Sequence, residues 1–573
     1  MVKNLYQPKL IITTCSVMLL ANVVLNAKDS VLDTMGTELD RSFQALQEQS
    51  APPYFLTYEI TQDEVVSING AFGQVTGTEK SVNRVLDVDI RVGDYFVDNT
   101  HPVNAPFGGL GDIFDLALPS IIPVDDPAAL RTVLWLHTDK KYKQAVTQLT
   151  NVQSILQAQV EKDDQSGDFS QTPTETYAEE TKDLIVDEDL LKRKIRLYTQ
   201  FFSDVAHIRS NSATISTDIE TRWFVNSEGT RIKVSHPYFR LIISASTKAD
   251  DGMVLGKSLT FEGTSQESLL QDTQIVTEVQ QLIADLKALR EAPLAEPYTG
   301  PAILYGRATG VFFHEVLGHR LEGHRLKDDD DGQTFLKAVN TQILPESISV
   351  VFDPTVEQFG DVPLLGTYKY DNQGVKGRRV VIVDRGVLKG FLMSRRPLEG
   401  FPTSNGHGRK NAGYLAIARQ SNMFVEVENP VSYETLKTML IERVTQEDKP
   451  YGLIFHDIQG GFTTTGRTIP NSFNVTPVLV YKIYPDGKTE VIRGADLIGT
   501  PLTTFSRVEQ GADDYAVFNG MCGAESGWVP VSTVAPSLLV SQIEVQKSST
   551  SRDIPPILPS PVRPPADRSI HTH

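Results

Sequence analysis

Two histidines enclose a glutamate and three further residues in the stretch HEVLGH, residues 314–319. Imidazole nitrogens are common zinc ligands, and a carboxylate beside a metal-bound water can accept its proton. A hydrolytic zinc site needs three protein ligands and one open position for water. His314 and His319 are therefore candidate metal ligands, and Glu315 is the candidate general base.

The spacing of the two histidines limits the backbone that can hold them. Residues four apart in an α-helix are offset by about 40° around its axis, whereas residues five apart are offset by about 140°. A regular helix therefore cannot direct both imidazoles at one atom. A π-bulge restores the alignment. An end of the helix near Gly318 does so too, because glycine tolerates unusual backbone conformations.

The motif alone does not establish a metal site. The chain has 11 histidines in 573 residues, and an accidental match is expected in roughly one of a hundred such chains. The competing interpretation is two hydrogen-bonded histidines at a helix end. Cys522 is a second observation, because it is the only cysteine besides Cys15 and a thiolate is a strong zinc ligand.

Other residues with chemical potential are weaker candidates. His407 lies in a glycine-rich stretch, SNGHGR, and is a candidate for binding substrate or stabilising developing charge. His324 follows the motif, but the adjacent Arg325 favours a surface position. The acidic run at residues 328–331 lacks the spaced ligands of a calcium loop and is expected to be a solvated loop.

Composition narrows the class of protein. Hydrophobic residues make up 40% and charged residues 22% of the chain, with a net charge of −18. These fractions are typical of a globular protein, and a length of 573 residues is enough for two to four domains. A negative field without a basic run argues against a nucleic-acid partner.

The N-terminus has the layout of a secretory signal peptide at residues 1–27. Lys3 and Lys9 precede a mostly apolar stretch, and Ala27 offers a small residue for cleavage. We therefore expect an exported protein, periplasmic or extracellular, without a stable membrane span after cleavage; the alternative is an uncleaved anchor. The mature chain would keep Cys522 as its only cysteine. This residue would form an intermolecular disulfide, remain a free thiol or bind a metal.

Hydrophobic periodicity predicts an α+β fold. The N-terminal part combines an amphipathic helix with alternating strands, which indicates a helix on an antiparallel sheet. A capping box at residues 264–267 is expected to open a long helix. The expected regions are an N-terminal α+β region at 28–125, and a middle region at 126–292 with a helix, an exposed acidic insertion at 161–183 and the long helix.

The remaining sequence predicts a β-rich C-terminal domain at residues 293–547 that carries the motif helix. It opens with a linker at 293–301, and turn residues predict hairpins at 380–393 and 478–492. Six prolines between 555 and 565 interrupt the tail at 548–573. That tail is expected to be disordered.

Several stretches together resemble the TldD/PmbA family. They are HEVLGH, the continuation RLEGHRL, VNSEGT at 225–230, SNGHGR at 404–409 and CGAESG at 522–527. The similarity extends from about residue 32 to residue 545. The chain departs from the family in its predicted export signal, since well-known members are cytoplasmic. The acidic insertion and the proline-rich tail are further departures.

The resemblance implies a zinc metallopeptidase of the catalytic TldD type, because PmbA/TldE-type partners lack the motif. Carried over, one Zn²⁺ per chain is bound by His314, His319 and Cys522, with Glu315 as base. The implied substrates are unfolded or extended peptides, and the implied assembly is a homodimer or a heterodimer with a PmbA/TldE-like chain. The alternatives are a non-catalytic secreted protein that binds peptides or a partner through a vestigial or structural metal site, and hydrolysis of another amide or ester.

Overall fold

The computed structural model describes most of the chain between the two ends. The described residues are 29–102, 120–121, 125–157, 164–266, 269, 272–327, 333, 335–463, 473–499 and 504–548. The predicted signal peptide lies outside them, and so do the acidic run at 328–331 and all of the predicted tail except Ser548. Over the described ranges no helix is both long and apolar enough to span a bilayer.

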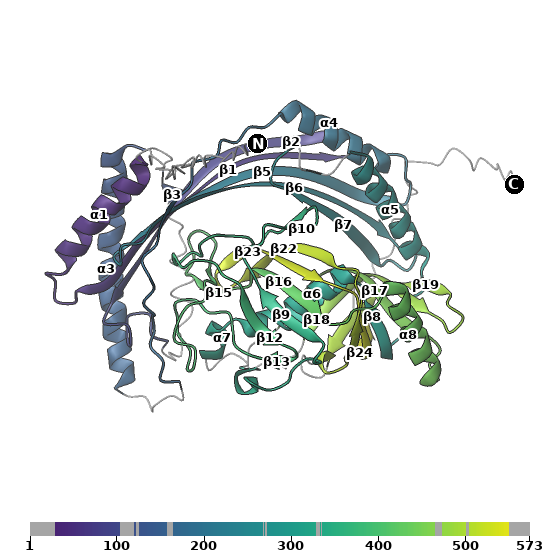
Figure 1. Ribbon diagram of the computed structural model, residues 1–573. Coiled ribbons are helices and arrows are strands. Elements are labelled where there is room, and N and C mark those ends of the chain that lie inside the picture. Colours follow the sequence, from purple (N-terminus) through teal and green to yellow (C-terminus); the bar gives the residue numbers. More distant parts are fainter. Residues whose placement is uncertain are drawn as a thin grey trace, which may run out of the picture.

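A large, mostly antiparallel sheet forms the N-terminal part and arches over the rest of the molecule (Figure 1). Its strand order is β3-β2-β1-β5-β6-β4, and β7 pairs with β6. The strands are β1 Pro53–Ala71, β2 Gln74–Val92, β3 Ser120–Ile121, β4 Thr176–Ala178, β5 Ile208–Asn226, β6 Arg231–Lys248 and β7 Val254–Gly263. Alternating apolar residues give the sheet one buried outer face.

Helices of the described chain cover this outer face. They are α1 Ser30–Leu46, α3 Pro127–Leu156, α4 Glu188–Thr199 with the short η1 Gln200–Phe202, and α5 Asp272–Glu291. The first three α-helices begin after Asp29, Asp126 and Asp187, whose side chains accept hydrogen bonds from the first turn. One apolar cluster joins α1 and α3 to the sheet, and another joins α4 and α5 to it.

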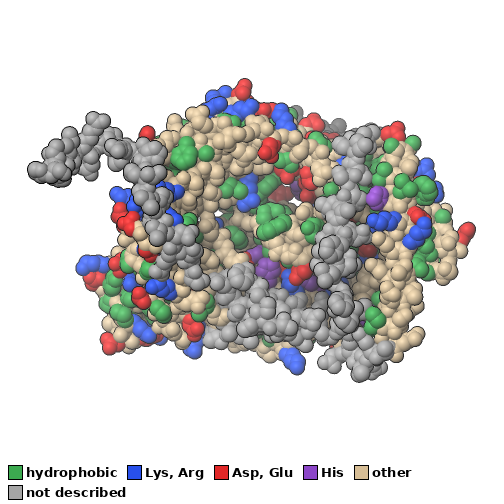
Figure 2. All heavy atoms as spheres, turned by 180° about the vertical axis from the view of Figure 1, so that it is seen from behind, with side chains coloured by type: hydrophobic (Ala, Val, Ile, Leu, Met, Phe, Trp, Pro, Cys, Tyr) green, Lys and Arg blue, Asp and Glu red, His purple; other side chains and the backbone are tan. Residues whose placement is uncertain are grey.

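The inner face of the arch turns toward the C-terminal region. Arg222 of β5 donates hydrogen bonds to the carbonyls of Tyr370 and Asp371. Lys410 forms an ion pair with Glu59 of β1, at 3.0 Å. Figure 2 shows from the back that the molecule is hollowed beneath the arch. The two regions therefore touch around a recess, through these polar contacts and through the apolar contact of Phe224 with Tyr370.

The C-terminal region contains a small barrel. Strands β17, β8, β24, β20 and β18 pair in that order, and β18 pairs back with β17, which closes the ring. β19 and β21 add to it at its rim. The strands are β8 Tyr298–Leu304, β17 Gly452–Thr463, β18 Phe473–Ile483, β19 Thr489–Ile492, β20 Ala495–Gly499, β21 Val508–Gly511 and β24 Leu538–Lys547. Closure removes the exposed strand edges of this sheet.

A second sheet packs beside the barrel, in the order β13-β12-β9-β16-β23-β22. Helix α6 lies between the two, in contact with β17, β22 and β23. The elements are β9 Ile348–Phe352, β12 Val380–Asp384, β13 Val387–Leu388, β16 Asn422–Val427, β22 Ala516–Ala524, β23 Gly527–Ala535, α6 Gly306–Val316, η2 Gly318–Leu321, α7 His324–Lys327, η3 Leu336–Ala338 and α8 Tyr433–Gln446, with two short hairpins, β10 Gln358–Phe359 with β11 Val362–Pro363 and β14 Gly408–Arg409 with β15 Ile417–Ala418.

The α+β class predicted from the sequence is confirmed. Both predicted hairpins form, as β12–β13 and β18–β19. Some limits differ: α5 begins at Asp272 rather than at the capping box, and β8 begins at Tyr298 inside the expected linker. Strands on both sides of residue 125 share one sheet.

The acidic insertion is exposed only in part: half of its described residues are exposed, whereas residues 168–170 are buried. Phe169 is buried, with the guanidinium groups of Arg91 and Arg395 at 3.8 and 3.9 Å from its ring centroid. Residues 176–178 form β4 alongside β6. Two aromatic residues, Phe169 and Tyr177, in a polar stretch give no periodic signal, so the contact of Phe169 could not be predicted from local pattern.

Candidate metal centre

Helix α6 carries the first histidine into the core. Its apolar residues pack inside the largest hydrophobic cluster of the C-terminal region. The helix ends at Val316; Leu317 follows with φ −103° and ψ −52°, and residues 318–321 form the 3₁₀ turn η2. The chain therefore ends the helix near Gly318, the second of the two geometries that the five-residue spacing allows.

The end of the helix brings three potential ligands together. The donor atoms of His314, His319 and Cys522 all lie within 4.8 Å of one another, and all three residues are buried. Nε2 of His319 is 3.4 Å from Sγ of Cys522, and the two imidazole centroids are 5.1 Å apart. Cys522 comes from β22, about 200 residues further along the chain, as the sequence predicted for a distant third ligand.

The donor set fits a zinc ion. Two imidazoles and one thiolate are ligands that zinc prefers, and three protein donors leave a fourth position for water. Nδ1 of His314 is buried and has no hydrogen-bond partner among the described residues. A buried polar atom without a partner is costly in a native protein unless something binds it. A metal ion bound through Nδ1 of His314 would remove this cost.

A carboxylate that we did not predict from the sequence orients the second histidine. Oε2 of Glu322 lies 3.2 Å from Nδ1 of His319, which leaves Nε2 to face Cys522. Glu322 is fully buried and also pairs with Arg325 at 3.0 Å and Arg419 at 3.4 Å. Metal-binding histidines commonly donate their other ring N–H to a carboxylate. The i, i+3 spacing from His319 was the signal that could have identified Glu322.

Charge interactions between the clustered side chains shift the pKa values of Cys522 and His319. Burial alone would raise the pKa of Cys522, but the adjacent His319 and His314 hold it well below the ordinary value of a thiol. Burial alone would lower the pKa of His319, but Cys522 and Glu322 raise it well above its ordinary value. The thiolate needed for metal binding is thus favoured before any ion is present.

Glu315 lies next to the first ligand on α6 and is buried. Burial raises the pKa of its carboxyl, and the neighbouring histidines His314 and His319 offset part of this rise. A carboxylate with a raised pKa beside a metal site can accept a proton from water and return it to a leaving group. Its position agrees with the predicted role of general base.

The other two histidines considered from the sequence lie outside the cluster. His407 has no exposed surface; its Nε2 lies 3.0 Å from Oγ of Ser421 and its Nδ1 lies near Asn405. Both ring nitrogens are engaged within the protein, which leaves neither of them for a substrate. His324 is buried rather than on the surface, and lies 3.9 Å from a carboxylate oxygen of Glu525.

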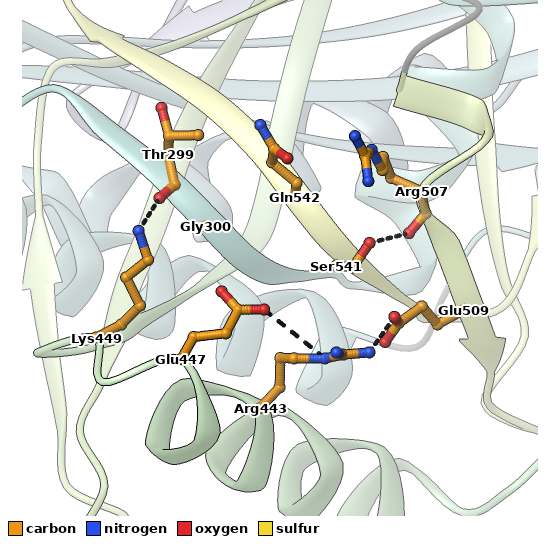
Figure 3. Close-up of a pocket in the computed structure, with 9 residues that line it drawn as sticks. All are labelled: Thr299, Gly300, Arg443, Glu447, Lys449, Arg507, Glu509, Ser541 and Gln542. Atoms are coloured by element: carbon orange, nitrogen blue, oxygen red, sulfur yellow. Dashed lines mark hydrogen bonds and ion pairs between the residues drawn. The ribbon is translucent and has the colours of Figure 1, made fainter.

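A separate pocket of about 350 Å³ lies on the C-terminal region (Figure 3). It is lined by Thr299, Gly300, Arg443, Glu447, Lys449, Arg507, Glu509, Ser541 and Gln542, none of which belongs to the cluster. Arg443 pairs with both Glu447 and Glu509. The charges of this pocket are therefore largely compensated within it, and it has no contact with the candidate metal ligands.

Comparison with known proteins adds a second line of evidence. Residues 297–547 match the family model of the PmbA/TldA metallopeptidase C-terminal domain. A metalloprotease of Methanocaldococcus jannaschii is 26% identical over 362 residues, which are 63% of this chain and 72% of that protein. A zinc metalloprotease TldD homolog of Saccharolobus solfataricus is 24% identical over 277 residues, 47% of this chain and 57% of that protein.

The fold is shared with a solved structure over most of the chain. TldE from Thermococcus kodakarensis superposes with a TM-score of 0.58 at 13% identity, covering 90% of this chain and 100% of that one. The matched domain, with its buried cluster of candidate metal ligands, indicates an enzyme of the metallopeptidase class. Residues 297–547 therefore carry the PmbA/TldA metallopeptidase C-terminal domain, and the chain is similar to metalloproteases of the TldD/PmbA type.

Proposed function

We propose that the chain is a zinc-dependent peptidase of the catalytic TldD type, with one zinc ion bound by His314, His319 and Cys522. The observation that carries the proposal is the convergence of these three buried donors directly beside Glu315. Among the described residues the cluster offers three such donors. A structural zinc site usually has four.

The chemistry assigned to the protein groups is acid–base catalysis. When bound, zinc acts as a Lewis acid that polarises a carbonyl and acidifies water. Glu315 takes the proton from the attacking water and passes it to the leaving amine. Glu322 keeps His319 in the orientation that presents Nε2.

We propose that the substrate is an extended peptide that adds to the edge of β22. This strand, which carries Cys522, is the last in its sheet, and in the described chain only β23 pairs with it. A peptide paired along that edge would be bound mainly through its backbone, so varied side chains are tolerated. A folded protein cannot bind this way, because its backbone groups are already paired.

Two further features of the proposal concern the setting of the enzyme. The N-terminal residues 1–27 support export to the periplasm or the outside of the cell. Similarity to both TldD-named and TldE-named proteins supports pairing with a second chain, either a copy of itself or a TldE-like protein.

One stable protein, presented folded and irreversibly unfolded, tests this function. We expect cleavage of the unfolded form only, and its loss when a chelator removes the metal. Equal cleavage of both forms would contradict binding at a strand edge. Absence of cleavage in a zinc-loaded enzyme, across several unfolded substrates, would favour the alternative of a non-catalytic binding protein.

A further inference from the structure

The break between α6 and η2 is filled by the side chain of Gln420. This residue is 1% exposed and comes from the segment between β15 and β16. Its Nε2 donates a hydrogen bond of 3.2 Å to the carbonyl of His314. That carbonyl lies in the last turn of α6, where backbone acceptors lack partners further along the helix. Gln420 thus supplies a partner from outside the helix.

Gly318 has no side chain because Gln420 occupies the space. A Cβ at position 318 would lie 1.9 Å from Oε1 and 2.3 Å from Cδ of Gln420. Gly318 is not among the glycines with positive φ. The reason for glycine here is therefore close approach, rather than the backbone freedom that the sequence suggested.

The preceding residue, Arg419, contacts the strand that carries Cys522. It has no exposed surface, and its Nη2 donates to the carbonyl of Cys522 at 2.6 Å while its Nη1 donates to Oγ of Ser526 at 2.8 Å. Its Nε lies 3.4 Å from Glu322, the partner of His319. Two adjacent residues therefore contact the backbone of two candidate ligands and the orienting partner of the third.

We propose that Arg419 and Gln420 are positioning residues for the metal centre. Gln420 caps α6 at His314 and fixes the turn that brings His319 back to the same point, although it is five residues away. Arg419 fixes the end of β22, which carries Cys522, and the turn that follows this strand. This inference rests on the proposed zinc site. It adds the two residues that hold the three candidate ligands in a geometry suited to one metal ion.

The first test is zinc binding by Gln420→Met, which keeps the length of the side chain and removes its donor. Competition with a chelating dye gives the zinc dissociation constant, and the spectrum of the Co²⁺-loaded protein reports the geometry of the thiolate site. We expect about 10–100-fold weaker zinc binding, as for other outer-shell changes, and an altered Co²⁺ spectrum. Gln281→Met on α5, whose amide donates to Asp285, is the control and should match wild type.

The second test is a double-mutant cycle. Gly318→Ala should weaken zinc binding strongly in the wild-type background, where Cβ meets the amide of Gln420. In a Gln420→Ala background that space is empty, so the same change should have little further effect. Thermal unfolding of the metal-free proteins identifies variants that are simply misfolded.

The outcomes separate the inference from the function on which it rests. A folded Gln420→Met protein with wild-type zinc affinity and Co²⁺ spectrum overturns the positioning role. If the Gln420 variants do not fold, Gly318→Ala decides alone, and wild-type affinity there overturns it. A wild-type protein that holds no zinc overturns the proposed function and this inference with it.

Discussion

Replacing Glu322 with glutamine removes a buried charge beside His319 without changing the shape of the side chain. Burial would raise the pKa of this carboxyl, but His319, Arg325 and Arg419 hold it well below its ordinary value. The ionised form of Glu322 is therefore favoured. The substitution leaves two buried guanidinium groups without that anion.

Two magnitudes follow from these contacts. Breaking a buried ion pair by removing one partner costs about 3–5 kcal/mol. Arg325 also pairs with Glu525, at 2.6 Å, so we expect the lower end, about 3 kcal/mol. The amide oxygen of glutamine can still accept from Nδ1 of His319. Zinc affinity should therefore fall about tenfold, or ~1.4 kcal/mol, the small end of outer-shell effects.

Chemical unfolding of the metal-free protein measures the first quantity, and chelator competition measures the second. Glu426→Gln is the matched control, because its ion pair with Arg379 has both side chains 51% exposed. Pairs of this kind contribute about 0–1 kcal/mol. If Glu322→Gln behaved like Glu426→Gln in both assays, the view that Glu322 orients the metal ligand would be refuted.

Two other predictions concern the thiolate and the arch. Cys522→Ser should lower zinc occupancy and peptidase activity together, because a serine hydroxyl stays protonated at neutral pH; thiol probes should label the metal-free wild type faster than the zinc-loaded one, and equal rates would exclude Cys522 as a ligand. Burial and the neighbouring Glu220 raise the pKa of Asp218 to about 7, from 3.8. The folded state then keeps a proton that the unfolded state has lost, so stability falls as pH rises through this window. Asp218→Asn should raise the melting temperature at about pH 8 and leave it unchanged at about pH 3; an equal shift at both values would contradict this.

The sequence identified the residues that meet at the candidate site, but not the residues that hold them in position. Two histidines, a glutamate and a lone cysteine are recognisable by type and spacing, and Gly318 correctly marked where the helix ends. The reason for that glycine was not predictable, because it is the amide of Gln420, about 100 residues away. Nothing local relates these two positions, and one sequence without relatives carries no record of their contact.

The fold shows the same division. Periodicity and turn residues predicted the α+β class and both C-terminal hairpins. The sequence did not predict that Phe169 would lie between two arginines, because that contact depends on how the arch packs over the C-terminal region. Contacts between distant segments are decided by tertiary packing rather than by local propensity.

The central claim is that Glu315 performs the proton transfers at a zinc site that it does not help to bind. The most direct measurement is zinc content and peptide hydrolysis in the same preparations of wild type and Glu315→Gln. We predict one zinc per chain in both proteins and hydrolysis of an unfolded polypeptide by wild type alone. Cleavage by zinc-loaded Glu315→Gln at the wild-type rate would contradict the account.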